Sequence, residues 1–371
     1  MVESERAAPP EVIAEAGSNH DGSVARALRL IDIGRAAGAS SVKFQFIYPD
    51  ELYLPAFRDG EELRPNPAHA QRTTEQLTPQ EWQEVWRYGE QVGIGLSASV
   101  FCERGLDLLA QLGAEYVKIA STDLTNLDLI DLAAARFDRV LVSTGMATLA
   151  EVSQTVAMVQ DRHPGVQLDL LHCVSSYPCP VEDANPARVR LLREAFGVRV
   201  GYSDHTEGSL SAILALSQGA ELFEKHFTDD RTRSGFDHAN AMEPDQLHSY
   251  IDDLRQAAAS LTGNANRTAP QEVETRIRAR RGVYAARDLP AGHILTRDDL
   301  LHVRPSTTQP TLPSQLIGRP LTSDVRRYDA LGSAEGVAAI GSRWREAAAY
   351  WTGEMDAKGM RPPSRDAADS E

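Results

Sequence analysis

The sequence predicts an α/β protein with a closed barrel of eight parallel strands, followed by a small, mostly-β domain. Three observations predict it. Eight short β-rich runs alternate with segments of helical periodicity, polar side chains gather at the C-terminal end of almost every run, and the composition changes at residue 282. Alternating strand and helix signals indicate a parallel sheet with crossover helices, and eight repeats within about 250 residues fit a (β/α)8, or TIM, barrel.

The eight predicted strands are short runs of apolar and β-branched residues bounded by turn signals. They are residues 12–18, 41–47, 94–99, 116–121, 140–144, 168–175, 199–203 and 221–227. Helical periodicity follows at residues 24–37, 79–92, 149–160, 209–218 and 244–261. Asp21 is expected to cap the first helix through its side-chain oxygen, with the neighbouring His20 in a structural role.

The remaining boundaries follow from composition. Residues 1–262 are assigned to the barrel, and the polar stretch 263–281 to a linker or surface helix. Residues 282–330 carry short β-like pieces with a turn at residues 290–292 and form the small domain. Residues 331–371 are expected to be a partly disordered tail with a short helix near residues 342–352.

The composition excludes several classes of partner. A net charge of −15 over 371 residues argues against a nucleic-acid or acidic-membrane partner, so an anionic ligand would need a locally basic pocket. Cys102, Cys173 and Cys179 match neither a disulfide framework nor a zinc-ribbon spacing. No apolar run approaches the roughly 18 residues of a membrane helix, and the N-terminus lacks a signal-peptide layout. We expect a cytoplasmic protein.

Two histidines, His205 and His226, end consecutive predicted strands. Adjacent parallel strands lie about 5 Å apart, so both imidazoles could reach one divalent cation. The alternative is that each histidine caps its strand and bonds a nearby carbonyl. Carboxylates close to both histidines in the sequence favour a metal site: Asp204, Glu224 and Asp229.

Two lysines, Lys43 and Lys118, stand near the ends of predicted strands and would project into the barrel mouth. They could clamp phosphate and carboxylate oxygens, one could form a Schiff base, or they could extend past the rim to solvent. A basic pair inside an acidic protein favours an anion. Hydroxyls placed to help are those of Ser121, Ser143 and Ser203.

Two carboxylates complete the predicted site. Glu15 points at the same mouth and could act as general base, support the metal or pair with a lysine. Asp237, in the loop after the eighth strand, could contact a polyhydroxylated substrate.

Seven segments taken together resemble one known family. IAEAGSNHDGS, SVKFQ, YVKIAST, STGM, LHCVSSYPCPVED, GYSDHT and EKHFTD occur in this order and resemble the sialic acid synthase family. The resemblance covers residues 12–325, including a second domain similar to the family's type III antifreeze-protein-like domain. It implies condensation of phosphoenolpyruvate with an N-acylmannosamine-type sugar, giving a nine-carbon 2-keto acid, with Mn²⁺ or Mg²⁺ as cofactor.

The resemblance also implies roles for individual residues. His205 and His226 would hold the metal, which polarises the sugar aldehyde, and Glu15 would handle the proton or stabilise the cation. The methylene carbon would attack the aldehyde, and water would add before phosphate leaves. Phosphoenolpyruvate would be bound without a Schiff base by Lys43, Lys118, Ser121, Ser143 and Ser203. The other implied substrate contacts are Gln45, Ser175, Tyr177, Asp237 and Arg304.

Arg304 lies in the second domain, and in this family that domain covers the barrel of the partner subunit. A domain-swapped homodimer with a site completed in trans is therefore implied.

The sequence departs from the family pattern at the top of the barrel. Ser175 stands where the sialic acid branch often has asparagine, and residues 97–99 read Ser-Ala-Ser instead of STP. The loop 46–76 is closer to relatives that accept other amino sugars, so the acceptor is predicted only as an amino or deoxyamino sugar.

Two alternatives stay open. Condensation with a plain sugar phosphate would need a second anion site, for which the candidates are Arg58, Arg64 and Arg72. A non-catalytic carbohydrate-binding relative would not need both histidines, both lysines and the Glu15 carboxylate.

Overall fold

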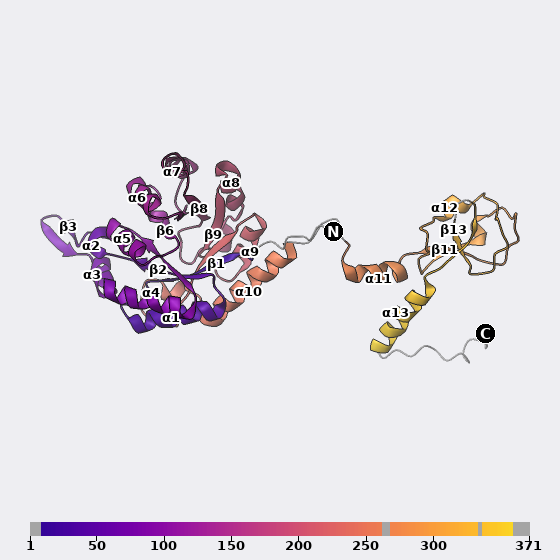
Figure 1. Ribbon diagram of the computed structural model, residues 1–371, viewed down its shortest axis with the longest axis horizontal. Coiled ribbons are helices and arrows are strands. Elements are labelled where there is room, and N and C mark those ends of the chain that lie inside the picture. The colour runs from indigo at the N-terminus through magenta and orange to yellow at the C-terminus, as the bar shows by residue number, and fades with distance from the viewer. Residues whose placement is uncertain (1–8, 262–267, 333–335, 359–371) are drawn as a thin grey trace. The chain divides into compact units, whose positions relative to one another are not determined.

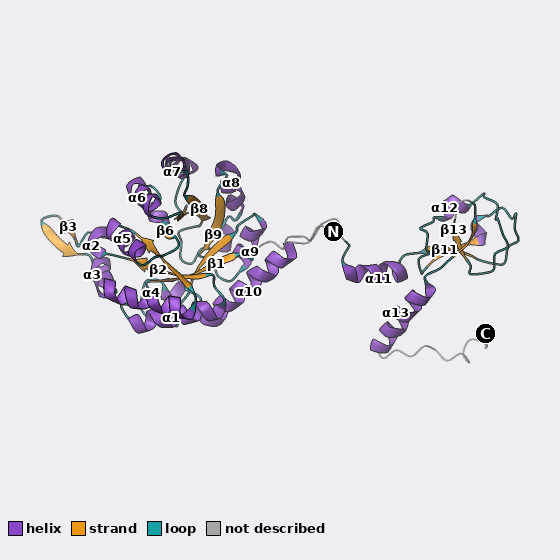
Figure 2. Cartoon of the chain, in the orientation of Figure 1, coloured by secondary structure: helices purple, strands orange, loops and turns teal. Residues whose placement is uncertain are grey.

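The computed structural model describes residues 9–261, 268–332 and 336–358. The chain divides into two compact units, residues 1–263 and 264–371. In the first unit, parallel strands close into a barrel that helices cover on the outside (Figure 1, Figure 2). The predicted α/β barrel followed by a small β domain is confirmed.

The barrel strands follow one another around the closed sheet in the order β1-β10-β9-β8-β7-β6-β5-β2. Their bounds are β1 Glu11–Gly17, β2 Ser41–Phe46, β5 Gly95–Val100, β6 Val117–Ile119, β7 Arg139–Ser143, β8 Gln167–His172, β9 Arg199–Asp204 and β10 Leu222–His226. The helices of this layer are α1 Val24–Ala37, α4 Pro79–Val92, α5 Glu103–Gln111, α6 Leu127–Arg136, α7 Leu149–Arg162, α8 Ala187–Phe196, α9 Leu210–Ser217 and α10 Pro244–Leu261.

Strand alternation decides what fills the barrel. Side chains two residues apart share a face, so on β1 Ile13 points the same way as Glu15. Ile13 packs with Tyr116, Leu141, Leu171 and Leu222 in a buried cluster of its own. The outward-facing apolar residues of the strands pack against the helices in a separate, larger core. The interior is therefore apolar below the mouth and polar at it.

Side-chain caps confirm three of the predicted helix starts, those at residues 24, 79 and 149, but the expected cap of the first helix is wrong. Ser23, not Asp21, caps α1 by accepting a hydrogen bond from the backbone N–H of Arg26. Asp21 instead pairs with the Arg26 guanidinium and with His238. Ser23 directly precedes the helix, whereas Asp21 lies two residues further away, and an N-cap oxygen must reach the N–H groups of the first turn.

The amino end of the barrel carries an ion cluster that the sequence analysis did not anticipate. Asp169 of β8 is fully buried, and its Oδ2 lies 2.7 Å from Arg139 Nη2 and 3.5 Å from Arg199 Nη1. Both arginines also contact Glu11 Oε2 at 2.8 Å. The cluster joins four strands at the face opposite the mouth.

The segment between β2 and α4, predicted only as a loop, contains elements of its own. They are α2 Pro49–Leu52, the antiparallel pair β3 Ala56–Asp59 and β4 Glu62–Pro65, and α3 Pro67–Thr74. Three single-turn helices lie in other loops: η1 Ser121–Asp123, η2 Val181–Asp183 and η3 His238–Asn240.

The second unit is built on a four-stranded antiparallel sheet of order β12-β11-β13-β14. Its bounds are α11 Pro270–Ala279, β11 Gly282–Ala285, η4 Arg297–Asp299, β12 Leu300–Val303, α12 Pro313–Leu316, β13 Ala330–Gly332, β14 Ala338–Ile340 and α13 Trp344–Ala357. The sheet thus runs past residue 330, where the sequence analysis placed a tail. Among the described helices, none is both long and apolar enough to cross a membrane.

Candidate active site

Four charged side chains meet inside the barrel mouth. Lys43 Nζ lies 2.5 Å from Glu15 Oε2 and 3.5 Å from Glu224 Oε2. Lys118 Nζ lies 3.3 Å from the same oxygen of Glu224. Strand register explains the meeting, because Glu15 is level with Lys43 in the β1–β2 pair. All four side chains are almost wholly buried, so their charges act through a poorly screened medium.

Hydroxyl and amide groups surround this centre. Lys43 donates a hydrogen bond to Ser99 Oγ at 2.8 Å, and Ser203 Oγ donates to Glu224 Oε1 at 2.9 Å. Gln45 Nε2 donates to Glu15 Oε1 at 3.2 Å. These contacts fix the carboxylates in place.

The two carboxylates respond differently to burial. Burial raises the pKa of Glu15 above its usual value, and the attraction of Lys43 only partly opposes this. Burial pushes the pKa of Glu224 in the same direction, but Lys118 and Lys43 outweigh it and hold the pKa well below its usual range. Burial lowers the pKa of Lys43, yet Glu15 and Glu224 overcompensate and raise it. Glu224 therefore stays anionic, while Glu15 is the carboxyl that can exchange a proton.

Two of the serines predicted to bind phosphoenolpyruvate, Ser121 and Ser143, and the predicted substrate contact Ser175 lie at or just after the ends of β6, β7 and β8. Ser121 Oγ and Ser175 Oγ lie 3.0 Å apart. The backbone of Gly145 passes so close that a Cβ there would lie 2.3 Å from Ser175 Oγ and 2.8 Å from Cys173 Sγ. Ser143, at the end of β7, is buried. A side chain at Gly145 would clash with these atoms, so glycine allows the loop after β7 to pack against Ser175 and Cys173.

The two predicted metal ligands stand side by side, with ring centroids 5.9 Å apart. His205 Nδ1 lies 2.7 Å from the Val174 carbonyl oxygen, so it donates there and leaves Nε2 as a lone-pair nitrogen. Burial lowers the pKa of His205 to about 3. Tyr177 stacks on His205 at a centroid distance of 4.1 Å. At neutral pH this imidazole is uncharged, as a metal ligand must be.

The donor set fits a divalent cation. Nδ1 of His226 is buried without a hydrogen-bond partner. Buried polar atoms normally have a partner, and a bound cation would provide one here. Within the described residues, no third histidine, cysteine or carboxylate joins the pair as a metal cluster. A cation held by two imidazoles would keep most of its coordination positions for substrate and water.

Two residues predicted to contact the sugar, Asp237 and Gln45, lie close to Gly17, whose φ is +55°. A Cβ at Gly17 would lie 2.9 Å from Asp237 Oδ2, 3.5 Å from Gln45 Nε2 and 3.6 Å from Glu15 Oε1. The bare glycine thus lets Asp237 approach Gln45 and Glu15. Arg304, the remaining predicted contact, is an exposed residue of the second unit, directly after β12, and its role stays a prediction.

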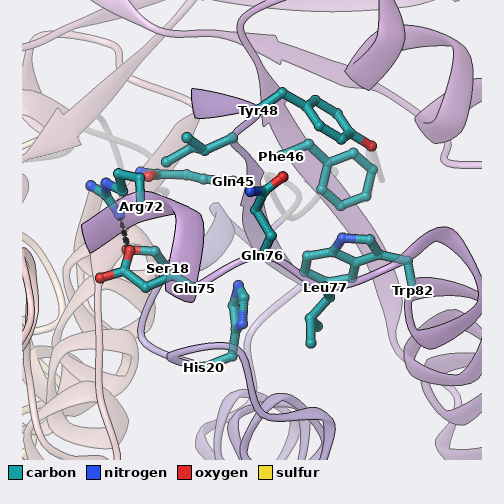
Figure 3. A pocket seen from close by; sticks show the side chains of 11 residues that line it. Ser18, His20, Gln45, Phe46, Tyr48, Arg72, Glu75, Gln76, Leu77 and Trp82 are labelled. Atoms are coloured by element: carbon teal, nitrogen blue, oxygen red, sulfur yellow. Dashed lines mark hydrogen bonds and ion pairs between the residues drawn. The ribbon is translucent and has the colours of Figure 1, made fainter. Parts of the chain in front are cut away.

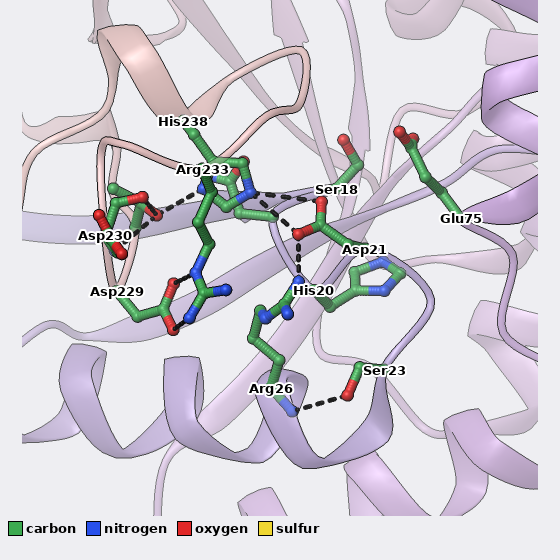
Figure 4. A network of polar contacts seen from close by, with 12 residues as sticks. Ser18, His20, Asp21, Ser23, Arg26, Glu75, Asp229, Asp230, Arg233 and His238 are labelled. Carbon is green, nitrogen blue, oxygen red and sulfur yellow. Dashed lines mark hydrogen bonds and ion pairs between the residues drawn. The ribbon is translucent and has the colours of Figure 1, made fainter.

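A second polar network holds the loop that carries Asp237 (Figure 4). His238 is fully buried, with Nδ1 2.6 Å from Thr228 Oγ1 and Nε2 3.2 Å from Asp21 Oδ2. The loops that follow the neighbouring strands β1 and β10 are therefore joined by side-chain contacts.

Comparisons with known proteins identify the family. Residues 30–266 match the NeuB family, and residues 280–328 match the SAF domain. The chain belongs to the NeuB family. This NeuB-family chain is 32% identical to the N,N'-diacetyllegionaminic acid synthase of Legionella pneumophila, over 85% of this chain and 91% of that protein. It is 30% identical to the pseudaminic acid synthase of Helicobacter pylori, over 84% and 93% respectively.

A solved structure shows the same relationship. The N-acetylneuraminic acid synthetase of Leptospira borgpetersenii, in complex with citrate, aligns with a TM-score of 0.64 and 32% identity. The alignment covers 72% of this NeuB-family chain and 90% of that chain.

The central position of Glu224 in this NeuB-family site was not predicted from the sequence. In the sequence Glu224 is marked only as a carboxylate near the histidines, yet in the structure it contacts both lysines and accepts a hydrogen bond from Ser203. A signal was available, because alternation in LFEKH places Glu224 on the same strand face as His226.

Proposed function

We propose that the protein condenses phosphoenolpyruvate with the open-chain form of an amino sugar, giving a nine-carbon 2-keto sugar acid and orthophosphate. The observation that carries this proposal is the pair of buried lysines, Lys43 and Lys118, that share Glu224 beside two adjacent histidines. Relatives named as legionaminic, pseudaminic and sialic acid synthases support the substrate classes. We place the reaction in the cytoplasm.

The residues divide the work between the two substrates. Lys43 and Lys118, with hydroxyls of Ser121, Ser143 and Ser203, bind the carboxylate and phosphate of phosphoenolpyruvate. A new bond forms between its methylene carbon and the aldehyde carbon, whose oxygen takes up a proton. Water adds at the former enol carbon, and the bond from that carbon to the phosphate oxygen breaks. Glu15 exchanges the proton, because its raised pKa suits that task.

The divalent cation of this proposal would be held by His205, whose Nε2 carries a lone pair, and by His226. When bound it supplies a Lewis acid for the aldehyde oxygen. Of the two expected ions, Mn²⁺ matches two imidazoles better than Mg²⁺, which demands oxygen ligands.

We further propose a homodimer in which Arg304 of one copy contacts the sugar bound in the other. The support is the exposed position of Arg304 in a unit of its own and the match of that unit to the SAF domain.

Phosphate release tests the reaction. Phosphoenolpyruvate and Mn²⁺ would be supplied with N-acetylmannosamine, its 6-phosphate, 2,4-diacetamido-6-deoxy sugars and plain aldoses, each repeated with a chelator. We expect release that requires both an amino sugar and the metal. Release with plain aldoses alone, or undiminished release under chelator, would contradict the proposal.

His205→Ala tests the metal site separately. Loss of this ligand should weaken Mn²⁺ binding by at least the roughly 10-fold to 100-fold that loss of an outer-shell partner costs. Free Mn²⁺ measured by electron paramagnetic resonance reports the affinity, and circular dichroism confirms the fold. Unchanged Mn²⁺ affinity in the folded variant would remove the assignment.

A further inference from the structure

A small cavity of about 20 Å³ lies beside Gln45 (Figure 3). One part of its wall is apolar and comes from Phe46, Leu77 and Trp82. Arg72 and Glu75, at the end of α3 and directly after it, contribute a charged pair. The volume is room for about one water molecule, so it holds a single heavy atom such as a methyl carbon or a hydroxyl oxygen.

Arg72 is held rigidly at this cavity. It is only 7% exposed, and its Nη1 donates to Ser18 Oγ at 2.5 Å and to Glu75 Oε2 at 2.9 Å. Its guanidinium carbon lies 3.9 Å from the ring centroid of Phe236, as in a cation–π contact. Nε is buried without a hydrogen-bond partner. The positive charge is thus already matched by Glu75, while one N–H stays available.

Each of these contacts adjoins the reaction centre. Ser18 follows Gly17, Phe236 precedes Asp237, and Gln45 lines the cavity while bonding Glu15. If the sugar aldehyde lies near Glu15, as the proposed function requires, the rest of the open chain passes Gln45 toward the Arg72–Glu75 pair.

We propose that this cavity receives the uncharged terminal carbon group of the acceptor, and that Glu75 rejects an acceptor phosphorylated at that end. A phosphate there would lie against the Glu75 carboxylate, and like charges in a poorly solvated place repel strongly. The free Nε–H of Arg72 serves a neutral oxygen of the sugar chain instead. The other two candidate arginines for a phosphate site, Arg58 and Arg64, are exposed on β3 and β4.

This inference rests on the proposed function and names its acceptor class, an unphosphorylated amino sugar. The test is Glu75→Gln, which keeps the side-chain size and releases the charge of Arg72. In the full-length enzyme, kcat/KM is measured for N-acetylmannosamine and for its 6-phosphate. We expect the native enzyme to prefer the unphosphorylated sugar, and the variant to shift the ratio toward the phosphate by tenfold or more, with the KM for phosphoenolpyruvate unchanged.

Glu62→Gln is the matched control, because Glu62 is an exposed carboxylate on β4 and its loss changes the net charge equally. It should leave the ratio unaltered. Native preference for the 6-phosphate, or an unchanged ratio in Glu75→Gln, would overturn this inference while the proposed reaction stands. Absence of turnover with every amino sugar would overturn both.

Discussion

The two buried carboxylates in the barrel mouth differ in pKa because they contact different numbers of lysine ammonium groups. Glu224 contacts Lys43 and Lys118, whereas Glu15 contacts Lys43 alone. The second lysine is enough to keep the pKa of Glu224 low, while burial dominates at Glu15 and raises its pKa. Titratable groups whose environments push their pKa values apart divide acid–base work between them.

Glu15→Gln should lower kcat by roughly 10²-fold to 10⁴-fold, the usual contribution of a positioned general acid or base. The carboxylate form of Glu15 is lost as pH falls through its pKa, which burial raises above the ordinary glutamate value of 4.5. The native pH–rate profile should therefore have an acidic limb above pH 4.5, and the variant should lack it. Measurement of kcat between pH 4.5 and 8 checks this.

Glu224→Gln is the matched substitution. Because the pKa of Glu224 is lowered, its charge is constant across that pH range, and its loss should weaken phosphoenolpyruvate binding through the two lysines. The acidic limb should persist in this variant. If Glu15→Gln kept the limb and Glu224→Gln lost it, the two roles would have to be exchanged.

The sequence predicted most of these side chains because strand alternation sends every second residue inward. Alternation says nothing about which charges touch. The bridge from Glu224 to both lysines depends on how strands β2, β6 and β10 face one another across a closed barrel, and that is a property of the fold.

At the scale of the element, the end of β1 shows how a strand can be shaped for the site. Gly17 combines a positive φ with a position where a Cβ would meet Asp237 Oδ2 at 2.9 Å. Gly17→Ala should cost about 1–2 kcal/mol of backbone strain. It should also displace Asp237 and raise the KM for the sugar more than that for phosphoenolpyruvate. Urea unfolding and steady-state kinetics measure the two effects.

Gly113→Ala separates strain from contact. Gly113 has φ +74°, and a Cβ there would meet nothing within 4 Å. The same loss of stability is expected with both KM values unchanged. A sugar KM that rises equally in the two variants would show that general destabilisation, not the Asp237 contact, is responsible.

Elements were predictable where a periodic apolar pattern marks them. The eight barrel strands have buried runs, whereas β3 and β4 are almost wholly exposed and carry no such pattern. β13 and β14 have only three residues each and lie in a stretch rich in alanine and glycine. Their pairing with a sheet begun some fifty residues earlier is a long-range contact that local composition does not encode.

At the scale of the whole molecule, the two faces of the barrel have different roles. The mouth holds the candidate site, and the amino face holds the ion cluster around Asp169. Barrel enzymes place chemistry at the C-terminal face and use the other face for stability. Asp169→Asn removes one charge from a buried network and should cost about 3–5 kcal/mol in the free energy of unfolding.

Activity per folded molecule should be unchanged in Asp169→Asn, as judged by kcat at a temperature where the variant remains folded. Asp59→Asn breaks the exposed 2.8 Å pair with Arg64 and should change stability by less than about 1 kcal/mol. If both substitutions lowered the free energy of unfolding equally, the buried cluster would stabilise the barrel no more than an exposed ion pair does.

If Arg304 of one copy contacts the sugar bound in the other copy, two different inactive or weakened variants should complement each other in a mixed dimer. Glu15→Gln inactivates a barrel, and Arg304→Ala should raise the KM for the sugar in the neighbouring copy's site. In a mixed dimer, one site receives both substitutions and the other receives neither. Co-refolding the two variants in equal amounts should therefore restore activity to about one quarter of the native level, since half of the dimers are mixed and each has one intact site. Activity equal to the mean of the separate variants would show that Arg304 serves its own barrel.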